Sequence, residues 1–224
     1  MPQIRYWHKA RQGIPVYMQE KSGGILQNMN FSRCYRNRSK YIYGFDPNIM
    51  LLQYKNLTIR NASIKDADLL SSWWNDGKIM AHAGFPYGIG ETTNEISEKI
   101  KKDTDENRHL IIELNKRPIG EMSYGKKGED TVEIGIKICD LSEHDKGYGK
   151  ILLSMLISSL FQDMGYKKII LDTNTNNKRA QHVYEELGFT KLRVNENSWK
   201  NQLGELQSSI DYELCHENFV NYAP

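Results

Sequence analysis

The sequence predicts a mixed α/β fold, and three observations support this prediction. Segments with the two-residue period of a strand alternate along the chain with segments that have the period of a helix. Residues 132–138 alternate apolar and other side chains without interruption, which is typical of a half-buried strand. The 224 residues are 39% hydrophobic and 26% charged, so the chain can bury a core and has neither a disordered nor a fibrous composition.

The first half of the predicted domain contains two helices between strands. A short strand at residues 57–60 precedes a helix that begins at Ser63, where Asp66 completes a capping box. After a loop at residues 84–90 that is rich in glycine, Thr92 and Glu95 mark the start of a second helix. Polar turns then separate three further strands, which are predicted at residues 109–114, 119–124 and 132–138.

The second half alternates helix and strand again. Gly147 and Gly149 open a helix whose apolar positions extend to Leu160, and Gly165 is its expected C-terminal cap. A second helix begins near Asn177 and ends at Gly188. The remaining strands are predicted at residues 168–173, 189–194 and 209–214. The predicted order is one strand, two helices, three strands, a helix, a strand, a helix and two strands.

Charge divides the chain near residue 50. Residues 1–55 contain nine Lys/Arg and two Asp/Glu, a net charge of +7, whereas residues 56–224 hold the remaining 21 and 26, a net charge of −5. We therefore expect residues 1–49 to be a basic, tyrosine-rich N-terminal extension and residues 50–224 to be the folded domain. A solvated extension explains this composition, and the same residues would also suit an arm that contacts nucleic acid or the ribosome.

Composition excludes several classes of protein. The three cysteines, Cys34, Cys139 and Cys215, form no close pair, which excludes a disulfide framework and favours a reducing, cytoplasmic location. The longest apolar run, residues 151–161, is interrupted by serines and is too short to span a membrane. The chain also lacks a recognisable secretion signal, and its histidines lack the spacing of a metal site.

A strand that ends at Ile138, a short loop and then a helix form the expected architecture of a phosphate cradle. Glycines allow successive backbone N–H groups to point into one concavity, and the helix N-terminus adds partial positive charge. A tight turn would also explain Gly-x-Gly by itself, and the sequence matches neither a P-loop nor the dinucleotide-binding fingerprint. The residues expected around this cradle are His144, Asp145, Lys146, Gly147, Tyr148, Gly149 and Lys150.

A second motif follows the cradle. Residues 177–189 match Asn-x-x-Ala-x-x-x-Tyr-x-x-x-Gly-Phe, and together with the glycine turn they resemble the GCN5-related N-acetyltransferase (GNAT) family over about residues 56–214. The segment Trp73-Trp74-Asn75-Asp76 is similar to the branch that includes ribosomal-protein N-terminal acetyltransferases and some aminoglycoside 6′-N-acetyltransferases. The resemblance implies a GNAT-type mixed central sheet with helices on both faces and acetyl-CoA in a splay between two parallel strands.

The resemblance also implies how acetyl-CoA, as co-substrate, would be held without a metal. Its pantetheine arm would pair with the backbone of Ile136, Lys137 and Ile138, and its pyrophosphate would bind the amides of residues 145–150. His144 departs from the family, which usually has Arg or Gln at that position. Asn177 would hydrogen-bond the pantetheine or a water molecule; the alternative is a plain helix cap.

Acetyl transfer requires a neutral amine and a stable leaving thiolate. The free base of a lysine-like amine costs about 4.6 kcal/mol at pH 7, and that of an α-amino group costs about 1 kcal/mol. By the resemblance, Tyr184 is the general acid that protonates the thiolate. Glu133 is the expected base, working through water, with Glu121 in reserve. The alternatives are a core tyrosine and a structural carboxylate.

The expected function is acetyl-CoA-dependent N-acetylation of a primary amine, either a peptide N-terminus or a small polyamine- or aminoglycoside-like molecule. The acidic charge of the domain favours a cationic acceptor, whereas the basic extension favours a ribosomal one. The alternative from another class is a non-catalytic acyl-CoA-binding regulatory protein with the same fold. A nucleic-acid-binding module is a third hypothesis, for which the acidic domain offers no surface.

We predict that a chain beginning at Met50 folds and binds acetyl-CoA as the full chain does, because residues 1–49 show little core-forming periodicity. Thermal melting of both chains with and without acetyl-CoA measures this. Loss of soluble expression on truncation would instead make the extension an integral part of the domain.

Overall fold

The computed structural model describes residues 49–223, and the extension predicted for residues 1–49 lies outside them except for Ile49. Within these residues one eight-stranded sheet has the order β1-β2-β3-β4-β5-β6-β8-β7. Neighbouring strands are antiparallel, except that β5 and β6 are parallel. The strands are β1 (Leu51–Tyr54), β2 (Leu57–Asn61), β3 (Asn107–Leu114), β4 (Arg117–Lys126), β5 (Thr131–Ile138), β6 (Lys168–Asn174), β7 (Thr190–Lys200) and β8 (Leu206–Cys215).

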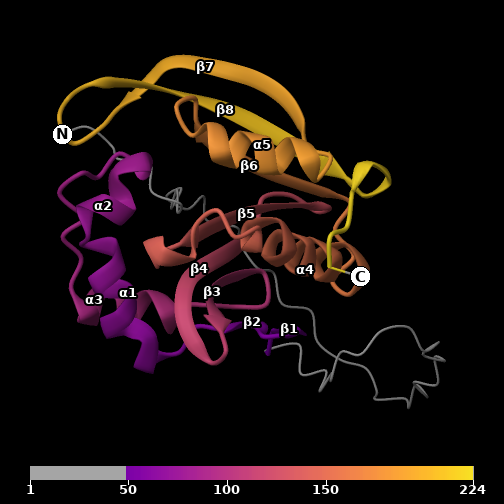
Figure 1. The fold of residues 1–224 in the computed structure, drawn as a ribbon, viewed down its shortest axis with the longest axis horizontal. Coiled ribbons are helices and arrows are strands. Elements are labelled where there is room, and N and C mark those ends of the chain that lie inside the picture. The colour runs from indigo at the N-terminus through magenta and orange to yellow at the C-terminus, as the bar shows by residue number, and fades with distance from the viewer. Residues whose placement is uncertain (1–48, 224) are drawn as a thin grey trace, which may run out of the picture. The chain divides into compact units, whose positions relative to one another are not determined.

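Helices cover both faces of the sheet, as the predicted GNAT-type fold requires. Val132 and Ile134 of β5 are buried in one core with Leu156 of α4, whereas Lys137, on the opposite face of β5, contacts Met80 of α2. Figure 1 shows α1, α2 and α3 together on one side of the sheet and α4 on the other. The helices are α1 (Ala67–Trp74), α2 (Gly77–Met80), α3 (Thr93–Ile100), α4 (Tyr148–Gln162) and α5 (Lys178–Glu186).

The core lies between α4 and the sheet. Leu152, Leu156 and Leu160 are fully buried along α4, at the spacing that puts them on one side of a helix. Each such side chain stabilises the fold by about 2 kcal/mol. None of the helices in residues 49–223 is long and apolar enough to cross a membrane.

Three elements differ from the prediction. β1 pairs with β2 through a two-residue turn in which Lys55 has a φ of 53°, so the turn lacks the glycine that usually marks a hairpin. The single-turn helix α2 has too few residues to show a period. β7 extends past its predicted end at Val194 to Lys200. The prediction stopped early because an irregularity in the pairing between Asn195 and Trp199 interrupts the alternation of side chains there.

The two predicted helix starts are present in different forms. Thr92 Oγ1 accepts a hydrogen bond from the Glu95 backbone, 3.3 Å away, and Glu95 returns one by accepting from the Thr92 N–H at 2.8 Å. At the first helix a 3-10 turn precedes α1, and the buried Asp66 carboxylate accepts from the Ser63 N–H at 2.7 Å. Asp66 also accepts two hydrogen bonds from Arg60 of β2, at 2.8 and 2.9 Å.

Asp66 therefore ties the first helix to the sheet. Burial alone would raise the pKa of its carboxyl, but the hydrogen bonds from Arg60 and Ser63 outweigh burial and hold the pKa below its usual value. A carboxyl with a lowered folded-state pKa contributes stability above its unfolded pKa, near ~3.9, and loses that contribution as the pH falls.

We predict that Asp66→Asn lowers the free energy of unfolding at pH 7 by about 2 kcal/mol, because it removes the charge-assisted hydrogen bonds from Arg60 and leaves Glu113, at 2.7 Å, as the charged partner of that guanidinium. The difference from the wild type should begin to shrink below about pH 3.9, where the carboxyl of the unfolded chain takes up a proton, and should disappear as the pH falls through the lower pKa of the folded state. Urea unfolding at several pH values measures both effects. Asp68→Asn, an exposed change in the same helix, is the control and should cost less than about 0.5 kcal/mol. A destabilisation that is the same at pH 7 and pH 3 would contradict the assignment.

Candidate active site

The parallel strands β5 and β6 separate after a short paired region. They pair only from Thr131 to Glu133 on β5 and from Lys168 to Ile170 on β6. Beyond that point β5 stays paired with β4, and β6 stays paired with β8, to the ends of both strands. The splay that the GNAT resemblance implies is therefore present, and it opens toward the start of α4.

Backbone groups of β5 point into this splay. The Cys139 N–H donates to the Ile119 carbonyl at 2.8 Å, so the odd-numbered residues of β5 form the hydrogen-bonded pairs with β4. The even-numbered Ile136 and Ile138 consequently direct their N–H and C=O groups toward β6. Of the three residues predicted to pair with pantetheine, Ile136 and Ile138 face the splay, whereas the Lys137 backbone faces β4.

The loop before α4 has the geometry of an anion cradle. Gly147 is the N-cap of α4 with a φ of 78°, and it has no side chain with which to cap the first-turn amides. A Cβ added at Gly147 or Gly149 would meet no atom within 4 Å. The free amides and the open space in front of them fit the diphosphate of a CoA molecule, with the backbone of residues 145–150 as its binding groups.

The charged side chains of the cradle have internal partners. Lys146 forms an ion pair with Glu143 at 2.8 Å, and Lys150 forms one with Glu186 at 3.1 Å. His144 contacts the Ile138 carbonyl through Nε2 at 2.8 Å. The side chain at the position that departs from the family therefore connects the cradle to the end of β5.

Tyr184 of α5 is buried beside the splay. Its side chain is 5% exposed and packs edge-on against Tyr212, at a ring distance of 5.6 Å, and against Phe189 at 5.8 Å. Burial, with the nearby charge of Asp172, raises the pKa of the Tyr184 hydroxyl far above its usual value, so the group stays protonated. Among residues 49–223 no hydrogen-bond partner is recorded for this hydroxyl, so it can donate to a ligand.

Asn177 caps α5. Its Oδ1 accepts a hydrogen bond from the Ala180 N–H at 3.2 Å. The cap leaves the Nδ2 donors and a second lone pair of Oδ1 available for the cofactor or a water molecule, so the two roles considered for Asn177 are compatible.

Glu133 and Glu121 lie on the sheet face opposite α4, because both face the same way as Lys137. Glu133 is the last β5 residue paired with β6, and its carboxylate forms an ion pair with Lys127 at 2.8 Å. Both oxygens of Glu121 are engaged, one by the Trp74 indole N–H at 2.8 Å and one by Lys137 at 3.1 Å. Glu133 is thus the less constrained of the two candidate bases.

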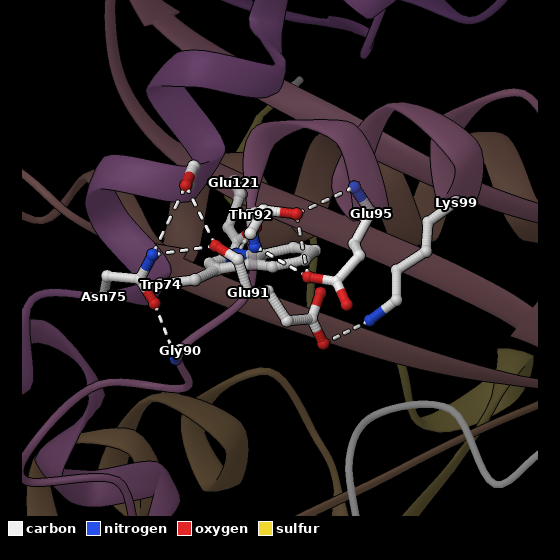
Figure 2. Close-up of polar contacts among 9 residues, drawn as sticks. Trp74, Asn75, Gly90, Glu91, Thr92, Glu95, Lys99 and Glu121 are labelled. Atoms are coloured by element: carbon white, nitrogen blue, oxygen red, sulfur yellow. Dashed lines mark hydrogen bonds and ion pairs between the residues drawn. The ribbon is translucent and has the colours of Figure 1, made fainter.

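The segment Trp73-Trp74-Asn75-Asp76 has roles that sequence reasoning did not assign. Figure 2 shows the Trp74 indole directed at Glu121 and the Asn75 amide between Gly90 and Glu91. Asn75 accepts from the Gly90 N–H at 2.7 Å and donates to the Glu91 carbonyl at 2.8 Å. The motif therefore holds the loop that leads into α3 against α1, beside the splay.

The β7–β8 hairpin closes the same side of the domain. The Gln202 side chain at its tip donates to the Gly88 carbonyl at 2.6 Å and accepts from the Tyr87 N–H at 2.9 Å. Trp199 packs so closely on Gly84 that a Cβ there would lie 2.3 Å from the ring. These contacts join two segments more than 100 residues apart in the chain, so no local pattern could predict them.

The histidines have separate partners. His109 Nδ1 contacts Asp103 at 2.7 Å, His182 lies 3.3 Å from Glu186, and His82 is exposed. In the part of the chain that the structure describes, no three His, Cys, Asp or Glu side chains are arranged to hold a metal ion.

Comparison with known proteins agrees with this geometry. Residues 56–190, more than half of the chain, match the family model described as an acetyltransferase (GNAT) domain. The chain belongs to the GNAT acetyltransferase family. A curated relative of this GNAT enzyme is spermidine N(1)-acetyltransferase of Vibrio cholerae serotype O1, which is 26% identical over 142 residues, or 60% of this chain and 79% of the relative.

Solved structures share the fold of this GNAT acetyltransferase. The spermidine N-acetyltransferase of Vibrio cholerae in complex with CoA and spermine has a TM-score of 0.66 and 22% identity, over 74% of this chain and 99% of that one. A GNAT-family acetyltransferase of Bacillus anthracis has a TM-score of 0.63 and 21% identity over 75% and 99%. The ribosomal L7/L12 α-N-protein acetyltransferase RimL has a TM-score of 0.64 and 12% identity over 75% and 94%.

We predict that Gly149→Val abolishes the rise in melting temperature that CoA causes in the wild type, because the side chain would fill the open space before α4. Gly149 tests this better than Gly147, where the positive φ would strain any β-branched residue. Gly128→Val is the matched control in the β4–β5 turn, where an added Cβ makes only ordinary contacts. An undiminished CoA shift in Gly149→Val would contradict the placement of the diphosphate.

Proposed function

We propose that this GNAT enzyme transfers the acetyl group of acetyl-CoA to a primary amine of a small cationic acceptor. The observation that carries the proposal is the splay between β5 and β6, with uncapped backbone amides at the start of α4 for the diphosphate at its open end. An extended pantetheine arm can pair with the inward-facing backbone of Ile136 and Ile138 in the splay. The thioester would then lie between the two faces of the sheet.

Candidate acid and base groups approach this splay from opposite faces. Tyr184 comes from the side of α4 and α5, and Glu133 comes from the side of α1 to α3. The amine nitrogen attacks the thioester carbon, a C–N bond forms and the C–S bond breaks. The amine loses one proton, which Glu133 would accept, and the sulfur leaves as a thiolate that a hydrogen-bond donor stabilises, so an acceptor and a donor on opposite sides suit the reaction.

Tyr184 would stabilise the thiolate as a hydrogen-bond donor. Complete proton transfer from a phenol of pKa about 10 to a thiolate of pKa about 8.5 is uphill by about 2 kcal/mol. Burial raises the pKa of Tyr184 and makes complete transfer still less favourable. Donation to the developing negative charge needs no transfer and is strongest in the transition state. Retention of Tyr184 together with a strand carboxylate argues against a non-catalytic acyl-CoA-binding protein.

Acidic residues on the acceptor face support a cationic substrate. Asp172 of β6 lies on the same sheet face as Glu133, directly opposite Asp211 of β8, whose carboxylate forms an ion pair with Arg193 at 2.8 Å. A relative that is 26% identical to this chain is named for spermidine, a polyamine. A polyamine-like amine therefore suits the site better than a peptide N-terminus.

The location that we propose is the cytoplasm. The use of acetyl-CoA as donor and the free thiols of Cys139 and Cys215 suit a cytoplasmic enzyme.

An acceptor screen tests the proposed function. Release of CoA would be followed with polyamines, aminoglycosides and short peptides in parallel. We expect turnover with polyamines above the rate of acetyl-CoA hydrolysis. Turnover with peptides alone would replace the proposed acceptor class, and a wild type that CoA does not stabilise against heat would overturn acetyl transfer itself.

We predict that Tyr184→Phe lowers kcat by about 100-fold or more with little change in the Kd for CoA, because the hydroxyl acts mainly in the transition state. The ring would still pack against Tyr212, so the melting temperature should hardly move. Tyr212→Phe, which removes a neighbouring hydroxyl, is the control and should keep near-normal kcat. Equal kcat values for wild type and Tyr184→Phe, with chemistry rate-limiting, would remove Tyr184 from the mechanism.

The same assay separates the candidate bases. Glu133→Gln should lower kcat, since the group that accepts the amine proton is lost. Glu121→Gln should act mainly through stability, because its carboxylate holds Trp74 and Lys137. If Glu121→Gln shows the larger kcat loss, the two roles are exchanged.

A further inference from the structure

A contact across the mouth of the splay is not explained by the reaction chemistry. His144 of the cradle loop contacts the Ile138 carbonyl through Nε2 at 2.8 Å and Arg179 Nη1 through Nδ1 at 2.9 Å. Arg179 is in the first turn of α5, so the contact links the end of β5, the cradle and α5. The residue that makes this contact, His144, is also the one at which the sequence departs from the GNAT pattern.

The partners determine the state of the His144 ring. A guanidinium has only donors, so Nδ1 must accept a hydrogen bond from Arg179. A carbonyl oxygen only accepts, so Nε2 must carry the proton that is donated to Ile138. In this arrangement the ring holds Arg179 without cancelling its charge.

The other cations at the cradle are already neutralised. Lys146 and Lys150 form ion pairs of 2.8 and 3.1 Å with glutamates. The nearest carboxylate that is recorded for Arg179 belongs to Asp145, at 3.6 Å, and both of these side chains are more than half exposed. A pair of that length and exposure contributes little, so Arg179 keeps most of its charge for another anion.

We propose that Arg179, positioned by His144, binds the diphosphate of the CoA molecule. A guanidinium can donate two parallel hydrogen bonds to phosphate oxygens, and His144 occupies only one of its five N–H donors. A cationic side chain at the cradle is thus supplied by Arg179 of α5, at a place where position 144 itself carries a histidine. This inference rests on the proposed acetyl-CoA-dependent function, and it concerns which side chain of the chain recognises the cofactor's charge.

Calorimetric titration of the full chain with CoA and with dephospho-CoA, which lacks the 3′-phosphate, tests the proposal. We expect Arg179→Gln to raise the Kd by about tenfold for both ligands, because both carry the diphosphate and a charged hydrogen bond is lost at a half-exposed site. The Kd of the wild type should also rise more steeply with salt than that of the variant. Lys178→Gln removes the neighbouring exposed charge of the same helical turn and should leave both Kd values within about twofold of wild type.

His144→Phe tests the positioning role. It should raise the Kd for CoA by about threefold, and the double variant with Arg179→Gln should bind no more weakly than Arg179→Gln alone, because the two residues act as one unit. Melting temperatures without ligand check that each variant folds. Additive losses would separate His144 from Arg179 and overturn the positioning role.

The remaining outcomes are decisive. An unchanged Kd in Arg179→Gln, an equal loss in Lys178→Gln, or a loss for CoA but not for dephospho-CoA would overturn the assignment of Arg179 to the diphosphate. Failure of the wild type to bind either ligand would instead overturn the proposed function, so the two failures are distinguishable.

Discussion

The separation of β5 from β6 is the constraint on which the rest of the site depends. Strands that stop pairing leave backbone donors and acceptors without partners, and such groups are costly to bury unless a ligand or water satisfies them. The pairing ends at Glu133 and Ile170, and both strands remain supported on their outer sides by β4 and β8. The sheet can therefore open at its centre without losing its edges, and the opening is where an extended molecule with its own amides could complete the ladder.

The helices that follow the two separated strands place different chemical groups on different sides of this opening. α4 begins with a glycine, so its N-terminal amides stay available for an anion, and α5 contributes Tyr184 from one side and Arg179 at the mouth. The opposite face carries carboxylates instead. Positive partial charge at one end and negative charge across the sheet suit a polyanionic donor and a cationic acceptor that approach from different directions.

Sequence periodicity was sufficient to predict the central helices and strands, but it did not predict β1, α2 or the full length of β7. The uninterrupted alternation of residues 132–138 and the glycine-bounded helices predicted β5, α4 and α5 correctly, because local pattern and tertiary burial agree there. β1, α2 and the second half of β7 were missed or truncated. A glycine-free turn at Lys55, a helix of one turn and an irregular strand after Asn195 carry little local signal, and long-range pairing stabilises them instead.

The sequence by itself determined the order of the elements from β2 onward apart from α2, the glycine turn, the Asn177–Phe189 motif and hence the family, because these depend on residues close together in the chain. Tertiary structure alone decided which backbone groups face the splay, that Glu121 is engaged by Trp74 and Lys137, and that His144 meets Arg179 across 35 residues. Such contacts depend on strand register and on how helices pack against the sheet. A one-residue change of register would turn every side chain of a strand to the other face, and no local pattern of residues encodes that choice completely.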